Sequence, residues 1–207
     1  TSDRRVVSAL LSPSSCIDII IPRGGKGLIE KVARETSIPI IKHLDGNCHM
    51  YIDDNADLEM AIALTVNAKT SRYGVCNALE SLLISKNSAK RILPLLCSEM
   101  RKRHVELRGC AETRGFVEGI KAATDADWSL EYLAPILSIK VVAGLSDAIE
   151  HINKFGSSHT DCIVTENTAN AQRFVKEVDS SSVMVNASTR FADGFEYGLG
   201  CLLYTSP

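Results

Sequence analysis

The sequence lacks the features that would place it in a membrane, secreted or nucleic-acid-binding class. No apolar run approaches the roughly 18 residues that a membrane-spanning helix needs, and the polar first residues contain no apolar signal-peptide region. The basic residues are scattered, and 23 Lys and Arg face 25 Asp and Glu, for a formal net charge of -2. This balance argues against a nucleic-acid partner. We therefore expect a soluble cytoplasmic protein that binds neither membrane nor nucleic acid.

Paired cysteines are also missing. The seven cysteines form no C-x-x-C pair and no even framework, so disulfides do not organise the fold. The histidines do not join them at zinc-site spacing, and we predict no metal site. Cys76 stands in a loop beside a glycine, where it is either a nucleophile or a small buried side chain. The cysteines inside strand or helix patterns are expected to fill the core: Cys16, Cys97, Cys110 and Cys162.

What the sequence does contain is a close alternation of strand and helix patterns. An apolar run over 16–21 predicts a buried strand, a glycine-rich turn follows, and helical spacing begins at 28. Further strands are expected at 38–41, 49–53, 82–85, 105–108, 139–142, 161–165 and 182–186, and helices at 28–34, 56–69, 88–103, 146–154 and 168–178. The alternation predicts an α/β layered fold with a largely parallel sheet. Ligands gather at the carboxyl ends of such strands, where we expect the glycine-rich turn and the Cys76 loop.

Three further features have two interpretations each. The turn over 23–27 could let a phosphate approach a helix start, or could need glycine for its conformation alone. His43 could transfer a proton or bond a loop carbonyl. Asp53, Asp54 and Asp57 look like a paired carboxylate site but are better explained by capping of the helix that follows.

Longer motifs are more specific than any of these residues. They read His-Leu-Asp-Gly-Asn-Cys-His at 43–49, Asn-Ala-Lys-Thr at 67–70, Tyr-Gly-Val-Cys-Asn-Ala-Leu-Glu at 73–80, Asp-Trp-Ser-Leu-Glu-Tyr-Leu at 127–133 and Gly-Ser-Ser-His-Thr-Asp at 156–161, followed by a long run over 182–200. Through them the chain resembles the aldehyde dehydrogenase superfamily, and most closely its γ-glutamyl phosphate reductase branch, over nearly its whole length. The resemblance implies an aldehyde dehydrogenase-like fold with a three-layer αβα catalytic domain and the last part of a Rossmann-like cofactor domain.

The resemblance also implies domain boundaries and a reaction. Residues 1–42 would be the C-terminal part of the NADPH-binding domain, 43–190 the catalytic domain, and 191–207 the truncated start of the oligomerisation segment. The reaction would be NADPH-dependent reduction of L-glutamyl 5-phosphate to L-glutamate 5-semialdehyde in proline biosynthesis, with release of phosphate. Cys76 would be the catalytic thiol and form a thioester. His43 stands where hydrolytic relatives carry the glutamate that activates water, which fits an enzyme that spares its thioester.

Other roles follow from the same resemblance. The cofactor would be bound by Arg23, Gly24, Gly25 and Glu131. The substrate would be bordered by Asn186, Ser188, Thr189 and Arg190, where the arginine either contacts a substrate carboxylate or phosphate or forms an ion pair inside its loop.

Family chains carry a further N-terminal half, and the tail over 201–207 departs from their pattern. We therefore expect a C-terminal fragment whose own activity is open, from a homo-oligomeric parent with glutamate 5-kinase as a candidate partner. The alternatives are a hydrolytic semialdehyde dehydrogenase of the same superfamily and an inactive truncated or binding module.

Overall fold

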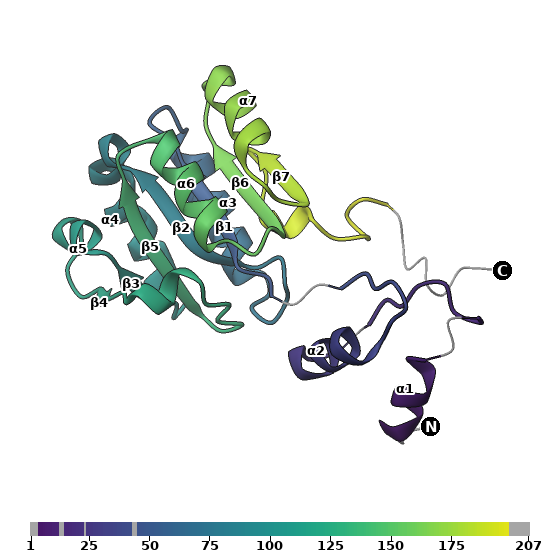
Figure 1. Ribbon diagram of the computed structural model, residues 1–207. Coiled ribbons are helices and arrows are strands. Elements are labelled where there is room, and N and C mark those ends of the chain that lie inside the picture. The colour runs from purple at the N-terminus through teal and green to yellow at the C-terminus, as the bar shows by residue number, and fades with distance from the viewer. Residues whose placement is uncertain (1–3, 13–14, 23, 43–44, 199–207) are drawn as a thin grey trace. The chain divides into compact units, whose positions relative to one another are not determined.

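The computed structural model describes residues 4–12, 15–22, 24–42 and 45–198, and the chain divides into two compact units between Asp45 and Gly46. The first unit contains the helices α1 (Arg4–Leu10) and α2 (Lys26–Glu35), shown in Figure 1. Its extended segments meet only at a parallel bridge between Ile20 and Ile40. The prediction of a buried strand over 16–21 is therefore wrong: Ile19 and Ile21 are 46% and 47% exposed, because the described part of this unit supplies no further strand to cover them.

The second unit is built on a parallel sheet of seven strands, in the order β4-β3-β5-β2-β1-β6-β7. The strands are β1 (Cys48–Ile52), β2 (Leu79–Ser85), β3 (Glu106–Gly109), β4 (Lys121–Ala122), β5 (Ile136–Val142), β6 (Thr160–Val164) and β7 (Ser182–Val185). The helices are α3 (Leu58–Thr70), α4 (Lys86–Lys102), α5 (Ala111–Phe116), α6 (Leu145–Phe155) and α7 (Thr168–Glu177), with the 3-10 turns η1 (Asp125–Trp128) and η2 (Thr189–Phe191).

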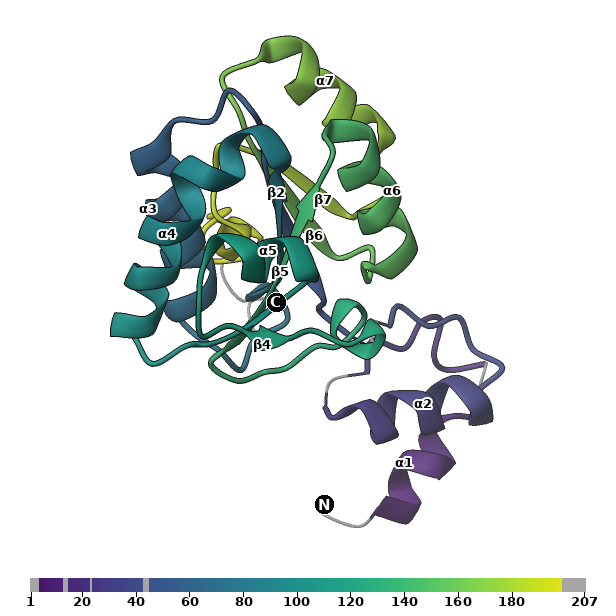
Figure 2. The ribbon, with the colours of Figure 1, turned by 90° about the vertical axis from the view of Figure 1, so that its left-hand side faces the viewer.

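Helices cover both faces of this sheet. Figure 2 shows α3 and α4 on one side and α6 and α7 on the other. Successive residues of a strand point to opposite faces, so Leu82 joins the core under α3 and α4 while Leu83 joins the core under α6 and α7. Strands buried on both faces read as continuous apolar runs. The predicted three-layer α/β fold is confirmed.

Some strands begin earlier than the sequence pattern predicts. The start of β2 contains two polar residues, Glu80 and Ser81, which are fully buried. A prediction based on apolar runs therefore misses the first residues of this strand. Ser81 shares a hydrogen bond of 2.7 Å with Ser138 of β5 through their Oγ atoms. Paired partners thus let polar residues occupy the centre of the sheet.

The acidic residues before α3 divide into two roles. Asp57 caps the helix as predicted, since its Oδ1 accepts the Met60 N–H at 2.7 Å. Asp53 does not: its buried Oδ2 accepts from Thr165 Oγ1 and Asn170 Nδ2, both at 2.7 Å. Asp54 accepts from Asn87 Nδ2 at 3.0 Å. The capping prediction for Asp53 and Asp54 is wrong, because their side chains bond α7 and α4 respectively and not the start of α3.

Candidate active site

The Cys76 loop lies at the amino edge of the sheet. Residues 71–78 run from the end of α3 to the start of β2, and every strand pair in this sheet is parallel. The expectation that this loop lies at the carboxyl ends of the strands is wrong, since a loop that leads into a parallel strand stands where that strand begins. The segments that lead into β1, β5 and β6 reach the same edge and bring Gly46, Glu131 and His159 there.

The start of β1 supports the backbone of Cys76. A Cβ added at Gly46 would overlap the Cys76 carbonyl group, so only glycine permits this approach. The buried Cys48 thiol donates to the Cys76 carbonyl oxygen at 3.2 Å. Cys76 is itself exposed. Gly46 and Cys48 therefore fix the backbone at Cys76, while Cys76 itself is exposed.

Accessibility separates Cys76 from the buried cysteines. Burial raises the pKa of Cys97 to about 11 and that of Cys162 to about 12, and it raises the pKa of Cys48 well above its usual value. These thiols stay protonated near neutral pH, and the reactive species is the thiolate. The core-filling expectation is confirmed for Cys97 and Cys162.

The two remaining predictions for core cysteines need correction. Cys16 is exposed, because its segment lacks a covering layer in the first unit. Cys110 is half-buried and caps α5, where its Sγ accepts the Thr113 N–H at 3.4 Å.

Asn77 connects the nucleophile loop to the segment around η2. Its Nδ2 donates to the carbonyl oxygens of Arg190 and Ala192, at 3.3 and 3.1 Å, and its own carbonyl accepts from Thr189 Oγ1 at 2.8 Å. Arg190 Nη1 donates to Asn77 Oδ1. Ser188 holds η2 by accepting the Arg190 N–H at 3.2 Å. Three of the four predicted substrate-bordering residues are thus brought to the residue that follows Cys76.

The fourth, Asn186, has another set of contacts. Its Oδ1 accepts the Thr165 N–H at 2.9 Å and its Nδ2 donates to the Thr165 carbonyl at 2.8 Å, at the end of β6. Its φ of 52° turns the chain after β7, in a left-handed conformation that asparagine tolerates. Cys162 Sγ then donates to the Ala187 carbonyl at 2.9 Å, so the segment returns over the sheet toward Asn77.

A buried ion pair holds the loop that carries Glu131. Lys69 Nζ lies 2.5 Å from Glu80 Oε2, both side chains are fully buried, and Glu80 Oε1 accepts the Leu133 N–H at 3.2 Å. Burial lowers the pKa of Lys69 and raises that of Glu80, and the opposite charge of each partner acts against both shifts. Leu133 has a φ of 52°, which its hydrogen bond to Glu80 helps to hold. The sequence signal for this pair is a glutamate close to the apolar run of β2.

The glycine-rich turn begins α2. Gly24 has a φ of 151°, a backbone conformation that favours glycine, and Gly25 is the N-cap residue with no side-chain cap. A Cβ at Gly25 would meet no atom within 4 Å, and the first turn of α2 contains no acidic residue. Backbone N–H groups at a helix start suit phosphate, so this turn fits a dinucleotide phosphate. The predicted residues Arg23 and His43 lie outside the described residues.

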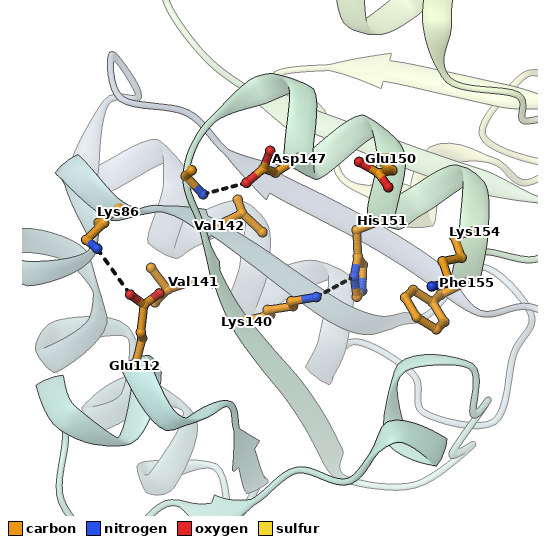
Figure 3. Close-up of a pocket in the computed structure, with 11 residues that line it drawn as sticks. Lys86, Glu112, Lys140, Val141, Val142, Asp147, Glu150, His151, Lys154 and Phe155 are labelled. Atoms are coloured by element: carbon orange, nitrogen blue, oxygen red, sulfur yellow. Dashed lines mark hydrogen bonds and ion pairs between the residues drawn. The ribbon is translucent and has the colours of Figure 1, made fainter.

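A separate cavity lies on the α6 face, at the carboxyl half of β5. It measures about 390 Å³, and Figure 3 shows Lys140 pointing toward His151, with 3.0 Å between Nζ and Nδ1. Lys86 and Glu112, which also line it, form an ion pair at 3.2 Å. No group of three or more His, Cys, Asp or Glu side chains in the described ranges is arranged to hold a metal ion.

Comparisons with known proteins agree with this geometry. The aldehyde dehydrogenase family model matches residues 122–198. The solved γ-glutamyl phosphate reductase of Thermotoga maritima is 45% identical with a TM-score of 0.93, over 96% of this chain and 48% of that one. The solved enzyme of that name from Saccharomyces cerevisiae is 37% identical with a TM-score of 0.59, over 93% and 49%. An acetylating aldehyde dehydrogenase from Geobacillus thermoglucosidasius, 20% identical with a TM-score of 0.72 over 94% and 51%, shares the fold.

The parallel sheet, the loop that presents a cysteine and these matches define an aldehyde dehydrogenase fold. The chain spans about half the length of the solved relatives, with 48% and 49% of their residues covered. Within the superfamily, the chain belongs to the γ-glutamyl phosphate reductases.

Proposed function

We propose that the protein carrying this chain reduces L-glutamyl 5-phosphate to L-glutamate 5-semialdehyde with NADPH and releases phosphate. One observation carries the proposal: an exposed thiol, Cys76, stands on a backbone held by Gly46, Cys48 and Asn77, in a γ-glutamyl phosphate reductase chain. A fixed backbone that presents an exposed nucleophile is what covalent acyl transfer needs.

The chemistry of Cys76 follows from its thiolate. The sulfur attacks the acyl carbon of the substrate, the carbon–oxygen bond to the phosphate breaks, and phosphate leaves with that bonding pair. The resulting thioester is reduced by a hydride, which NADPH supplies when bound. The thiohemiacetal then releases the aldehyde as its carbon–sulfur bond breaks and the thiolate returns. The Cys76 backbone N–H stabilises the negative oxygen of the tetrahedral states.

The remaining residues have supporting roles in this proposal. Arg23, Gly24 and Gly25 bind the cofactor phosphates at the start of α2, and Glu131 contacts the nicotinamide ribose. His43 occupies the position of a water-activating glutamate and so protects the thioester from hydrolysis. Ser188, Thr189 and Arg190 border the acyl substrate, and Asn186 turns their segment back toward the Cys76 loop.

We extend the proposal to the whole protein. Residues 1–42 contribute the C-terminal part of the NADPH-binding domain, residues 43–190 form the catalytic domain, and residues 191–207 begin the oligomerisation region of a homo-oligomer. Because an acyl phosphate hydrolyses readily, a kinase that makes it, glutamate 5-kinase, is the proposed partner, in the cytoplasm. None of the helices in the described ranges is long and apolar enough to cross a bilayer.

The test uses a full-length protein that carries this sequence and follows NADP⁺ reduction with glutamate 5-semialdehyde, with and without phosphate. We expect phosphate-dependent turnover that disappears in Cys76→Ser and persists in the matched variant Cys16→Ser, whose thiol is also exposed. His43→Glu should add phosphate-independent turnover. Phosphate-independent turnover by the unmodified protein would instead indicate a hydrolytic dehydrogenase, and a folded protein without turnover would indicate a binding module.

A further inference from the structure

A cavity beside the Cys76 loop contains one cation and one anion. It measures about 310 Å³ and is lined by Asn67, Ser71, Arg190, Phe191 and Glu196. Among these lining residues, Arg190 is the single positive charge and Glu196 the single negative charge. A dianionic phosphate favours a site with several positively charged donors. A zwitterion favours a site with one positive and one negative side chain. The composition of the cavity therefore favours a zwitterion over a phosphate.

One edge of the Arg190 guanidinium makes no hydrogen bond to the described residues. Its Nη1 donates to Asn77 Oδ1, while its Nε is buried and has no hydrogen-bond partner among the described residues. Nε and Nη2 form the opposite edge of the planar guanidinium, and two parallel N–H donors match the two oxygens of a carboxylate. A buried N–H without a partner costs free energy, and a bound carboxylate would remove that cost.

Two residues that line the cavity connect it to Cys76, one on the segment before Cys76 and one through the residue after it. Ser71 follows the last turn of α3, where its N–H bonds the Asn67 carbonyl at 3.2 Å, and it begins the loop that carries Cys76. Arg190 bonds Asn77, the residue directly after Cys76. In L-glutamyl 5-phosphate two methylene groups separate the α-carbon from the reacting carbonyl. A substrate attacked by Cys76 therefore carries its α-amino and α-carboxylate groups only a short distance from that sulfur.

We infer that this cavity recognises the α-amino acid end of the substrate, with Arg190 binding the α-carboxylate and Glu196 the α-ammonium group. The inference rests on the proposed function and adds to it the determinant of substrate choice. Asn67 and Ser71 supply neutral donors and acceptors at the rim. The reacting acyl phosphate then points to Cys76, and the phosphate is bound by other groups.

The experiment compares kcat/KM of the full-length protein for four aldehydes at saturating NADP⁺ and phosphate. They are glutamate 5-semialdehyde, 5-oxopentanoate without the amino group, 4-aminobutanal without the carboxylate, and butanal without either. Arg190→Gln should lower kcat/KM about 10- to 100-fold more for the two carboxylates than for the other two aldehydes, as expected for a charged hydrogen bond. Glu196→Gln should lower kcat/KM more for the two amines than for the two aldehydes without an amino group.

Controls separate recognition from structure. Arg190→Lys, which keeps the charge and loses the paired donors, should recover part of the carboxylate preference. Arg173→Gln, a variant of an exposed ion pair on α7 with Nε 2.9 Å from Glu177 Oε1, should change none of the four values. An equal loss with butanal would overturn the inference, because it would show that Arg190 acts only through Asn77. A raised KM for phosphate in Arg190→Gln would overturn it in favour of a phosphate site.

The same measurements distinguish this inference from the proposed function. The requirement of the unmodified protein for phosphate tests the reaction. The pattern of losses across the four aldehydes tests the cavity, whether or not phosphate is required.

Discussion

The two units of the chain differ in how far their apolar residues are buried. In the second unit, β1, β2 and β6 are buried along their whole length between two helix layers. In the first unit, Leu10 and Ile41 are 53% and 58% exposed, and apolar residues line an open groove of about 360 Å³. An apolar run becomes a buried strand only when strands flank it and helices cover it, and among the residues that the structure describes, those of the second unit provide both.

The difference extends to charged groups. The first unit holds Lys31 and Glu35 as a half-exposed pair, with 3.9 Å between Nζ and Oε2. The second unit buries Lys69 and Glu80 completely, at 2.5 Å. Exposed pairs contribute little to stability, whereas loss of one partner from a buried pair leaves an uncompensated charge. The interior of the second unit therefore tolerates less change at its charged residues than the surface of the first unit does.

The largest predicted effect on stability separates the buried ion pair from the exposed one. Lys69→Met should lower the free energy of unfolding by about 3 to 5 kcal/mol, measured by urea denaturation of the full-length protein. Lys31→Met is the matched variant and should change it by less than about 0.5 kcal/mol. The double variant Lys69→Met, Glu80→Leu should regain much of the loss, because no buried charge is left alone. Equal losses for Lys69→Met and Lys31→Met would abolish the contrast between the units.

A second prediction compares leucines. Leu93→Ala removes a side chain that is 0% exposed on α4, and should cost about 2 to 5 kcal/mol of unfolding free energy through lost burial and a cavity. Leu28→Ala on α2, where the side chain is 37% exposed, should cost below about 1 kcal/mol. The same denaturation measurement checks both. A cost for Leu28→Ala as large as that for Leu93→Ala would mean that the full-length protein covers the first unit as tightly as the second.

The smallest effect concerns pH. Burial lowers the pKa of His151 from 6.5 to about 3. Between pH 3 and pH 6.5 the unfolded chain therefore binds more protons at this residue than the folded chain does. The unfolding free energy should therefore fall as pH drops below about 6.5, by up to about 1.4 kcal/mol per pH unit from this residue. Asp161, whose pKa burial raises to about 6, acts in the opposite direction. The comparison with His151→Gln isolates the histidine: the variant should lose less stability than the unmodified protein between pH 6 and pH 4, and parallel curves would contradict the assignment.

Prediction from the sequence succeeded where the signal is local. Helical spacing located α3, α4, α6 and α7 within two residues at either end. It failed where polar side chains find distant partners. β2 begins at Leu79, ahead of the predicted start, because Glu80 pairs with Lys69 and Ser81 with Ser138.

The site shows the same division. Cys76 and the segment 188–190 could be selected from the sequence, because they lie in the runs of residues on which the resemblance to the family rests. No motif indicated that Asn77 would hold Arg190, or that Gly46 and Cys48 would support the Cys76 carbonyl. Asn77 and Arg190 are 113 residues apart, and their contact depends on how the chain returns after β7.

By itself, the sequence determined the α/β class and the positions of the main helices, and its motifs led to the prediction that Cys76 is the nucleophile, because periodicity and short motifs are properties of neighbouring residues. Only the tertiary structure decided that the Cys76 loop stands at the amino edge of the sheet, that a buried ion pair holds the Glu131 loop, and that one edge of Arg190, which lines a cavity, makes no hydrogen bond to the described residues. These features arise from strand order and from contacts between distant segments, and local pattern carries no information about either.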